Sequence, residues 1–122
     1  MLATDKGRAR FWAESALEIN GKIEFKFPNG QSWSGRVLER IEPHRFAVEY
    51  IGGSIVTFEL KDDGRGGTDL TLTDKGVAPT EQAEISAGWV SVLLALKAAS
   101  DFGVDLRNHD AQRTWNASFV DN

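Results

Sequence analysis

Apolar and polar residues alternate along much of the first two thirds of the chain. Between residues 17 and 27 the apolar side chains are Leu17, Ile19, Ile23, Phe25 and Phe27, with polar or charged ones between them. A two-residue period with one apolar face is typical of a half-buried antiparallel strand. Pro28, Asn29 and Gly30 follow and predict a turn that closes this strand into a hairpin.

Four later segments keep the same period: residues 32–42, 45–51, 54–61 and 68–74. Turn-forming residues separate them, among them Gly52-Gly53, where glycine adopts a positive φ without steric cost. Successive hairpins predict an antiparallel meander with its strands in sequential order. One face of that sheet is apolar and needs a cover.

Two segments have helical spacing instead. Residues 6–13, capped by Thr4 or Asp5, predict a short helix that carries Phe11 and Trp12. Residues 80–102 predict a long helix, which is the expected cover of the sheet. Its apolar stripe comprises Ile85, Trp89, Val92, Leu93 and Leu96.

The apolar surface of the long helix is wider than one sheet contact needs, because Val90 and Leu94 lie off the main stripe. Either the C-terminal tail covers them, using Trp115, Phe119 and Val120, or a second subunit does. We expect the tail to pack there, with Trp115 and Phe119 on one side of a short helix.

Composition sets broad limits on the protein class. The 122 residues suit one domain, and 41% hydrophobic with 26% charged residues is ordinary for a globular protein. The net charge of −4 argues against a nucleic-acid partner. The chain has no cysteine, no recognisable signal peptide and no run of about 18 apolar residues. These features predict a cytoplasmic protein that does not contact a membrane.

The apolar face shared by the sheet and the long helix is the candidate ligand site. Its members are Trp33, Val37, Phe46, Val48, Tyr50, Phe58, Leu70, Trp89 and Leu93. One interpretation is a pocket for an apolar or aromatic ligand, with Tyr50 as its polar group. The alternative is plain core packing, which is the commoner meaning of an aromatic-rich face.

Glu39 is the one candidate for pocket chemistry. It is in phase with the inward positions Val37 and Ile41, so desolvation would raise the pKa of its carboxyl group. Such a group could serve acid–base work or bind a polar part of a ligand. Alternatively, a bulge turns Glu39 outward, or Arg36 or Arg45 pairs with it.

Other chemistry finds little support. His44 and His109 are isolated, so no metal site is expected. Ser86 and Ser91 have no positioned histidine and aspartate, so no catalytic nucleophile is expected. The glycines of residues 64–67 do not lead directly into a helix, as a phosphate loop must. We expect no cofactor.

Several motifs occur in an order that is similar to one domain family. They are Gly35-Arg36-Val37-Leu38-Glu39 with Pro43, Val56-Thr57-Phe58-Glu59-Leu60, Gly66-Gly67-Thr68-Asp69-Leu70-Thr71-Leu72-Thr73, and Gly88-Trp89. They resemble the heat-shock-protein-90 ATPase activator homologue-like family of the START-like (SRPBCC, helix-grip) superfamily. The resemblance extends from about residue 4 to residue 103.

The resemblance implies an α+β helix-grip fold, a curved antiparallel β-meander wrapped around a long C-terminal helix with a pocket between them. Residues 1–103 would form this domain, and residues 104–122 a tail that packs on the domain or on a partner. The superfamily contains lipid carriers, hormone receptors, cyclases and protein-binding modules. The fold alone therefore does not specify a function.

One departure from the family concerns its first strand, which the chain lacks. In the family that strand precedes the short helix and pairs beside the last strand, here residues 68–74. Without it the last strand is an unprotected edge. The start of the chain is truncated, or the tail covers the edge, or two chains pair there. We favour a homodimer through the last strand or the long helix.

Three functions follow as hypotheses. The leading one is non-enzymatic binding or sensing of a small apolar ligand in the cavity between sheet and helix. The second is a chaperone-associated protein-interaction module. The third is a cyclase- or hydrolase-like enzyme, which requires Glu39 and Tyr50 to converge on one cavity as proton-transfer groups.

Overall fold

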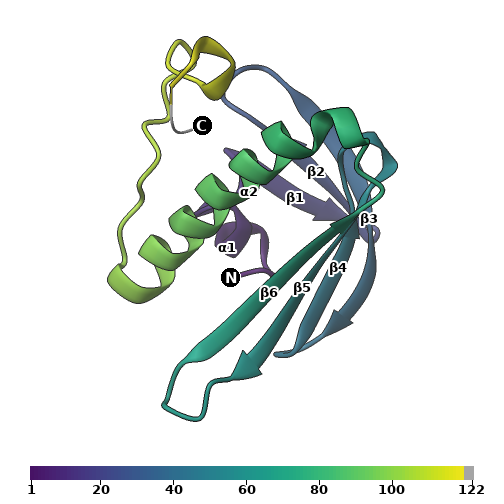
Figure 1. Cartoon of the computed structure of the whole chain (residues 1–122), viewed down its shortest axis with the longest axis vertical. Coiled ribbons are helices and arrows are strands. Elements are labelled where there is room, and N and C mark those ends of the chain that lie inside the picture. The colour runs from purple at the N-terminus through teal and green to yellow at the C-terminus, as the bar shows by residue number, and fades with distance from the viewer. Residues whose placement is uncertain (120–122) are drawn as a thin grey trace.

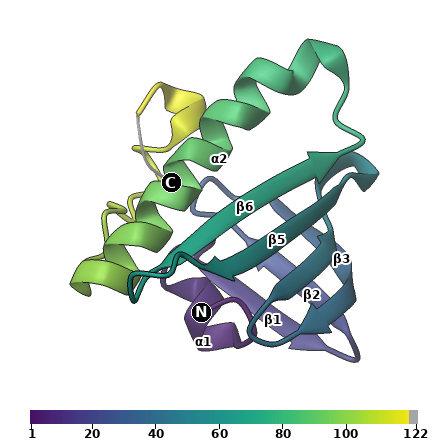
Figure 2. The same ribbon diagram turned by 60° about the horizontal axis from the view of Figure 1, so that its bottom comes forward.

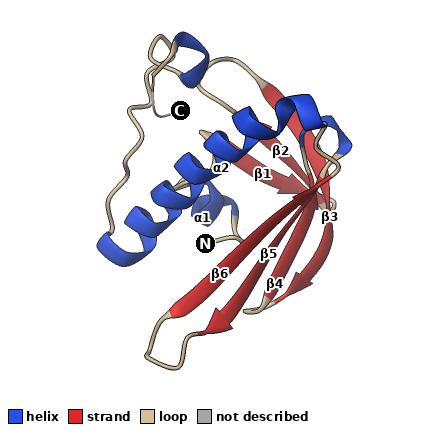
Figure 3. Ribbon diagram, viewed as in Figure 1, coloured by secondary structure: helices blue, strands red, loops and turns tan. Residues whose placement is uncertain are grey.

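A curved antiparallel sheet and one long helix make up the protein, and the computed structural model describes residues 1–119 (Figure 1). The six strands lie in the order β1-β2-β3-β4-β5-β6. Their bounds are β1 Ser15–Ile19, β2 Lys22–Lys26, β3 Ser32–Ile41, β4 Arg45–Glu49, β5 Ile55–Asp62 and β6 Thr68–Lys75. The predicted meander is therefore confirmed. Figure 3 shows that loops and short turns join these strands in succession.

The first predicted strand is wrong in one respect, since residues 17–27 form two strands. Asn20 and Gly21 have φ values of 53° and 76° and make the tight turn between β1 and β2. The turn changes which residues face the core. Ile23 and Phe25 are fully buried, whereas Leu17 and Ile19 are 51% and 68% exposed.

The short N-terminal helix, α1 (Asp5–Ala9), begins where Thr4 accepts a hydrogen bond from the Gly7 amide at 3.0 Å. It is shorter than the predicted 6–13. Arg8 is fully buried and donates hydrogen bonds to the carbonyl oxygens of Ala16 and Leu2. These bonds tie α1 to β1 and offset much of the desolvation of the guanidinium.

The long helix crosses the concave face of the sheet (Figure 2). It comprises a 3-10 turn, η2 (Pro79–Glu81), then α2 (Gln82–Lys97), and a final π-helical turn, η3 (Ala98–Phe102). The face of α2 that carries Trp89, Val92, Ala95 and Leu96 is buried. The predicted stripe is thus confirmed at Trp89, Val92 and Leu96, while Ile85 and Leu93 are partly buried against the same core.

By length and hydropathy the segment Pro79–Phe102 could cross a membrane, which the sequence analysis did not anticipate. In this fold the segment is the helix that covers the sheet. Its apolar side chains Trp89, Val92 and Leu96 pack on the strands, and a core helix of this kind meets the same criteria.

An aromatic cluster fills part of the space between the sheet and α2, with side chains from the segment after α1, from β2 and β5, and from α2. Trp12 stands at its centre, with ring centroids 4.8 Å from Phe25, 5.5 Å from Tyr50, 5.2 Å from Phe58 and 5.8 Å from Trp89. The Trp12 indole also donates a hydrogen bond to the Tyr50 hydroxyl at 3.0 Å. Side chains therefore occupy this part of the interior.

The tail packs against the α1 side of the molecule, not on Val90 and Leu94, which remain 59% and 55% exposed. Arg107 donates to the carbonyl oxygens of Ala9 at 2.7 Å and Ala13 at 3.0 Å. The predicted cover of the helix by the tail is wrong for the described residues. Trp115 begins a 3-10 turn, η4 (Trp115–Ala117), and Val120 lies outside the described residues.

His109 strengthens this attachment, because its ring nitrogens lie 2.5 Å from Glu14 and 2.8 Å from Asp105. The hydrogen bond to Asp105 is the main cause of a raised His109 pKa. In turn, hydrogen bonds from Arg107 hold the pKa of Asp105 well below its usual range. The three side chains form one charged network between the tail and residue 14.

This network predicts a pH dependence of tail attachment. A raised His109 pKa means that its contribution is full below the ordinary histidine value of about 6.5 and is lost as pH rises through the raised pKa. The lowered Asp105 pKa keeps its contribution full above about pH 3.9. Limited proteolysis of the tail should therefore be slowest between about pH 4 and 6.5.

The control for this prediction is the second histidine. His109→Gln should flatten the rise in tail cleavage above about pH 6.5, whereas His44→Gln, in an exposed turn, should leave it unchanged. In the unmodified chain, a tail that is cleaved no faster well above about pH 6.5 than between about pH 4 and 6.5 would contradict the assignment.

Candidate functional site

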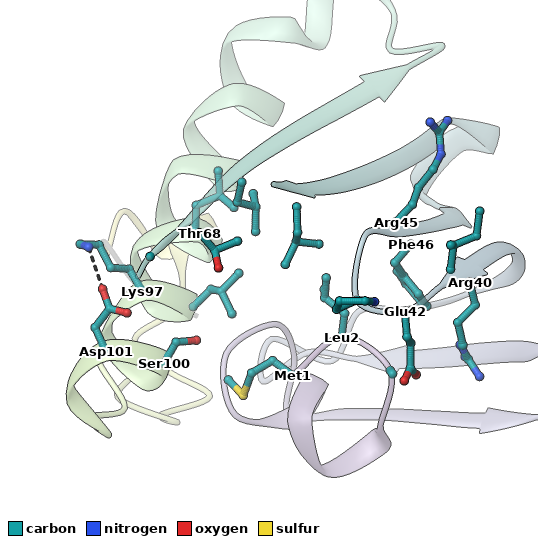
Figure 4. Close-up of a pocket in the computed structure, with 18 of the residues that line it drawn as sticks. Met1, Leu2, Arg40, Glu42, Arg45, Phe46, Thr68, Lys97, Ser100 and Asp101 are labelled. Atoms are coloured by element: carbon teal, nitrogen blue, oxygen red, sulfur yellow. Dashed lines mark hydrogen bonds and ion pairs between the residues drawn. The ribbon is translucent and has the colours of Figure 1, made fainter. Parts of the chain in front are cut away.

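An opening that we call the main cleft lies between the C-terminal half of α2 and the end of the sheet where β3 meets β4 and β5 meets β6 (Figure 4). Its volume is about 720 Å³. Apolar side chains from five segments line it: Met1 and Leu2 at the start of the chain, Phe46 on β4, Leu60 on β5, Leu70 on β6, and Leu93 and Leu96 on α2. Charged groups lie around this surface, and Figure 4 shows Lys97 and Asp101 on the helix side, and Arg40, Glu42 and Arg45 opposite them.

A smaller opening of about 460 Å³ lies beside the N-terminal half of α2, and we call it the Asp74 cleft. It shares Leu93 with the main cleft and is lined by Leu72, Ile85 and Val90, among others. One Asp74 carboxylate oxygen accepts a hydrogen bond from the Trp89 indole at 2.9 Å. The other oxygen is buried and has no hydrogen-bond partner among the described residues.

The predicted site residues divide between these clefts and the packed core. Phe46, Leu70 and Leu93 line the main cleft, and Trp89 and Leu93 line the Asp74 cleft. The remaining apolar members line neither cleft and pack in the core or against it: Trp33, Val37, Val48, Tyr50 and Phe58. Sequence periodicity marks the inward face but does not show where side chains leave space.

Tyr50 is partly buried and packs against the aromatic cluster. Its hydroxyl accepts the Trp12 hydrogen bond, and burial raises the pKa of the phenol above its ordinary value. The group therefore stays protonated at neutral pH. It is also absent from the lining of both clefts.

Glu39 faces away from both clefts, so its predicted inward phase is wrong. The register of β3 against β4 shifts between Val37 and Glu39, which places Glu39 opposite Ala47 instead of on the face of Val48. On the convex side its carboxylate pairs with Arg45 at 2.7 Å. The enzyme hypothesis requires Glu39 and Tyr50 to converge on one cavity, and they do not.

The same shift brings Arg40 onto the concave face, a residue that sequence reasoning missed. Arg40 lies opposite Phe46 in the sheet, with its guanidinium 5.7 Å from the ring centroid, and lines the main cleft. It also pairs with Glu18 at 2.5 Å. Strict alternation predicts that Arg40 points outward, and only the bulge reverses it.

No cluster of three or more metal-ligating side chains occurs among residues 1–119. His44 lies in the turn between β3 and β4, and His109 is held in the tail network.

A protein-family model matches most of the chain. The model described as activator of Hsp90 ATPase homolog 1-like protein matches residues 2–101. The chain belongs to this family. The six-stranded antiparallel meander and the long C-terminal helix agree with the helix-grip class predicted from the motifs.

Two solved structures share the fold of this family member. The crystal structure of the protein SSP2350 from Staphylococcus saprophyticus is 19% identical, with a TM-score of 0.72 over 87% of this chain and 82% of that one. The solution structure of the Aha1 dimer from Colwellia psychrerythraea is 22% identical, with a TM-score of 0.70 over 84% of each chain. At these identities the likeness concerns the fold. Among curated proteins, none matches the chain.

Proposed function

We propose that the chain binds a small, uncharged apolar ligand in the main cleft and carries or senses it without changing it. The observation that supports this most directly is the cleft itself. Its volume of about 720 Å³ lies in the range of about 300–1,000 Å³ typical of small-molecule sites. Leu60, Leu70, Leu93 and Leu96 give it an apolar wall on both the sheet and the helix.

The charges around the cleft favour an uncharged ligand. Lys97 pairs with Asp101 at 2.7 Å, and Arg40 pairs with Glu18. Arg45 pairs with two glutamates on the convex side. Each cation already has a carboxylate partner, so an anionic ligand would have to displace an existing ion pair.

Leu93→Trp tests the cleft because this side chain lies where the two clefts meet. A tryptophan there should fill the space and weaken binding of the neutral dye Nile red by about tenfold or more, a loss of about 1.4 kcal/mol. Leu38→Trp is the matched control, since Leu38 is 45% exposed and lines neither cleft.

Thermal-shift measurements then distinguish the ligand class. Decanol should raise the melting temperature of the unmodified chain, whereas decanoate should raise it less, because the basic side chains of the cleft are paired. Equal Nile red binding by both tryptophan variants would contradict the proposed site. A larger shift with decanoate would contradict the proposed ligand class.

Self-association is part of the proposal and is supported by two exposed surfaces. Among the described residues no strand pairs with the outer edge of β6, and Val90 and Leu94 are exposed on α2. One fold neighbour is described by its title as a dimer. Sedimentation velocity at micromolar concentration should give a dimer, and a monomer throughout this range would contradict it.

A second candidate function is association with a chaperone ATPase, which the family description supports. It predicts that the chain raises the ATPase rate of Hsp90 when added at micromolar concentration. No change in that rate, together with no co-purification of Hsp90, would remove this candidate.

A further inference from the structure

The outer edge of β6 is the feature that carries a further inference. All eight residues of β6 pair with β5, and no described strand lies on the other side. An eight-residue edge with free backbone donors and acceptors is a template for another strand. The opposite edge, β1, is shorter at five residues, and α1 packs beside it.

The register with β5 assigns the side chains of β6 to the two faces. Leu70, Leu72 and Asp74 lie opposite Leu60, Phe58 and Val56, so they share the concave face with the core. The intervening residues lie on the convex face: Asp69, Thr71, Thr73 and Lys75.

We propose that two copies of the chain pair antiparallel through β6, about a twofold axis that lies midway between the two copies of Leu72. This inference rests on the proposed self-association and specifies its interface. A twofold axis normal to the sheet keeps both concave faces on one side, so concave residues must lie opposite concave residues. One residue of β6 must therefore lie directly opposite its own copy, with the axis midway between the two.

The charged side chains of β6 determine which residue lies opposite its own copy. With the axis at Leu72, Asp69 lies opposite Lys75 of the partner subunit, and the symmetry gives this pair twice. Thr71 then lies opposite the partner's Thr73. Axes at Thr71 or Thr73 give no opposite-charge pair. Because neither Asp69 nor Lys75 has an ion-pair partner within residues 1–119, both are available for the partner.

The exposed apolar residues of α2 next to β6 are also suited to contact a second copy of the chain. Val90 lines the Asp74 cleft together with Leu72 and Asp74, so it lies on the side of α2 that faces β6, and Leu94 follows one turn later. Pairing through β6 brings a second α2 toward this exposed stripe. An isologous contact of this kind covers the strand edge and the stripe together.

Pairing of two copies through β6 would also enclose the two clefts further. Thr68 and Leu70 of the main cleft, and Leu72 and Asp74 of the Asp74 cleft, all belong to β6. A partner strand beside β6 therefore adds a wall to both openings, and the partner's Leu70 lies opposite Asp74 at the smaller one.

A single cysteine tests the register, because the chain contains none. With the axis at Leu72, residue 72 lies opposite its own copy, where Cβ atoms are about 4.5–5.5 Å apart and a disulfide is within reach. Leu72→Cys should give a disulfide-linked dimer in a glutathione redox buffer. Thr71→Cys should not, since its own copy is about 7–8 Å away along the diagonal.

Ile19→Cys on β1 is the control for the other edge and should stay monomeric on a non-reducing gel. Cross-linking through Thr71→Cys without Leu72→Cys would move the axis and overturn the proposed register. Cross-linking through Ile19→Cys alone would overturn the proposed edge.

A charge exchange gives a second measurement that does not depend on cysteine. Asp69→Lys places lysines opposite each other and should raise the dimer dissociation constant about tenfold, whereas Asp69→Lys combined with Lys75→Asp should restore it. If sedimentation finds the unmodified chain monomeric, the self-association itself fails. If the chain is dimeric but neither Leu72→Cys nor Asp69→Lys has its effect, only this interface fails.

Discussion

Replacing Trp12 with alanine should lower the free energy of unfolding by about 3–5 kcal/mol, the range for removing a large buried aromatic side chain. Trp12 is fully buried and contacts the rings of Phe25, Tyr50, Phe58 and Trp89. Its loss leaves a cavity at the centre of the core and removes the donor to the Tyr50 hydroxyl. Urea unfolding monitored by circular dichroism measures the change.

Trp115→Ala is the matched control. Trp115 is 37% exposed and lies in the tail, so its removal should change stability by about 0.5 kcal/mol or less. Similar losses for both variants would show that the aromatic cluster around Trp12 is not the main source of stability.

Gly35→Ala should be the second most damaging change. Gly35 lies in β3 between two neighbouring strands, and a Cβ atom added there would be 1.6 Å from the carbonyl oxygen of Glu49. Backbone on a central strand must shift to relieve this overlap. The expected loss is at or above the upper end of the about 1–3 kcal/mol typical of overpacking, measured by the same urea titration.

Gly88→Ala provides a control with the opposite sign. Gly88 lies within α2, and an added Cβ atom meets nothing within 4 Å. Alanine there should stabilise the protein by about 0.5–1 kcal/mol, because it restricts the unfolded chain and favours the helix. A neutral or stabilising Gly35→Ala would contradict the observed approach of β3 to β4.

The first hairpin shows why alternation predicts strands better than it predicts faces. Ile19 and Ile23 are separated by an even number of positions, so the period continues without a break through the turn. Across a two-residue turn, however, Ile19 lies opposite Lys22, and odd positions before the turn share a face with even positions after it. The Asn20-Gly21 pair was the available signal for this turn.

The candidate site was harder to predict than the fold for a related reason. The bulge after Val37 moves Glu39 to the convex face and Arg40 to the concave one, and the residues at the shift, Val37, Leu38 and Glu39, include no glycine that would mark its position. The clefts also depend on how far α2 stands from β6, which is a property of packing between distant segments. Patterning identified Phe46, Leu70 and Leu93 as inward-facing but could not separate them from the filled core around Tyr50.

The contact between Arg107 and the N-terminal segment has a consequence for synthesis on the ribosome. Arg107 hydrogen-bonds to carbonyl groups that lie 94 and 98 positions earlier in the chain. The strand hairpins can form from local pairs as they emerge, but this bond must wait until residue 107 has emerged, after all six strands and α2 have been translated. The segment from Ala9 to Ala13 therefore leaves the exit tunnel before the sheet does, and it gains this contact only after the sheet and α2 have emerged.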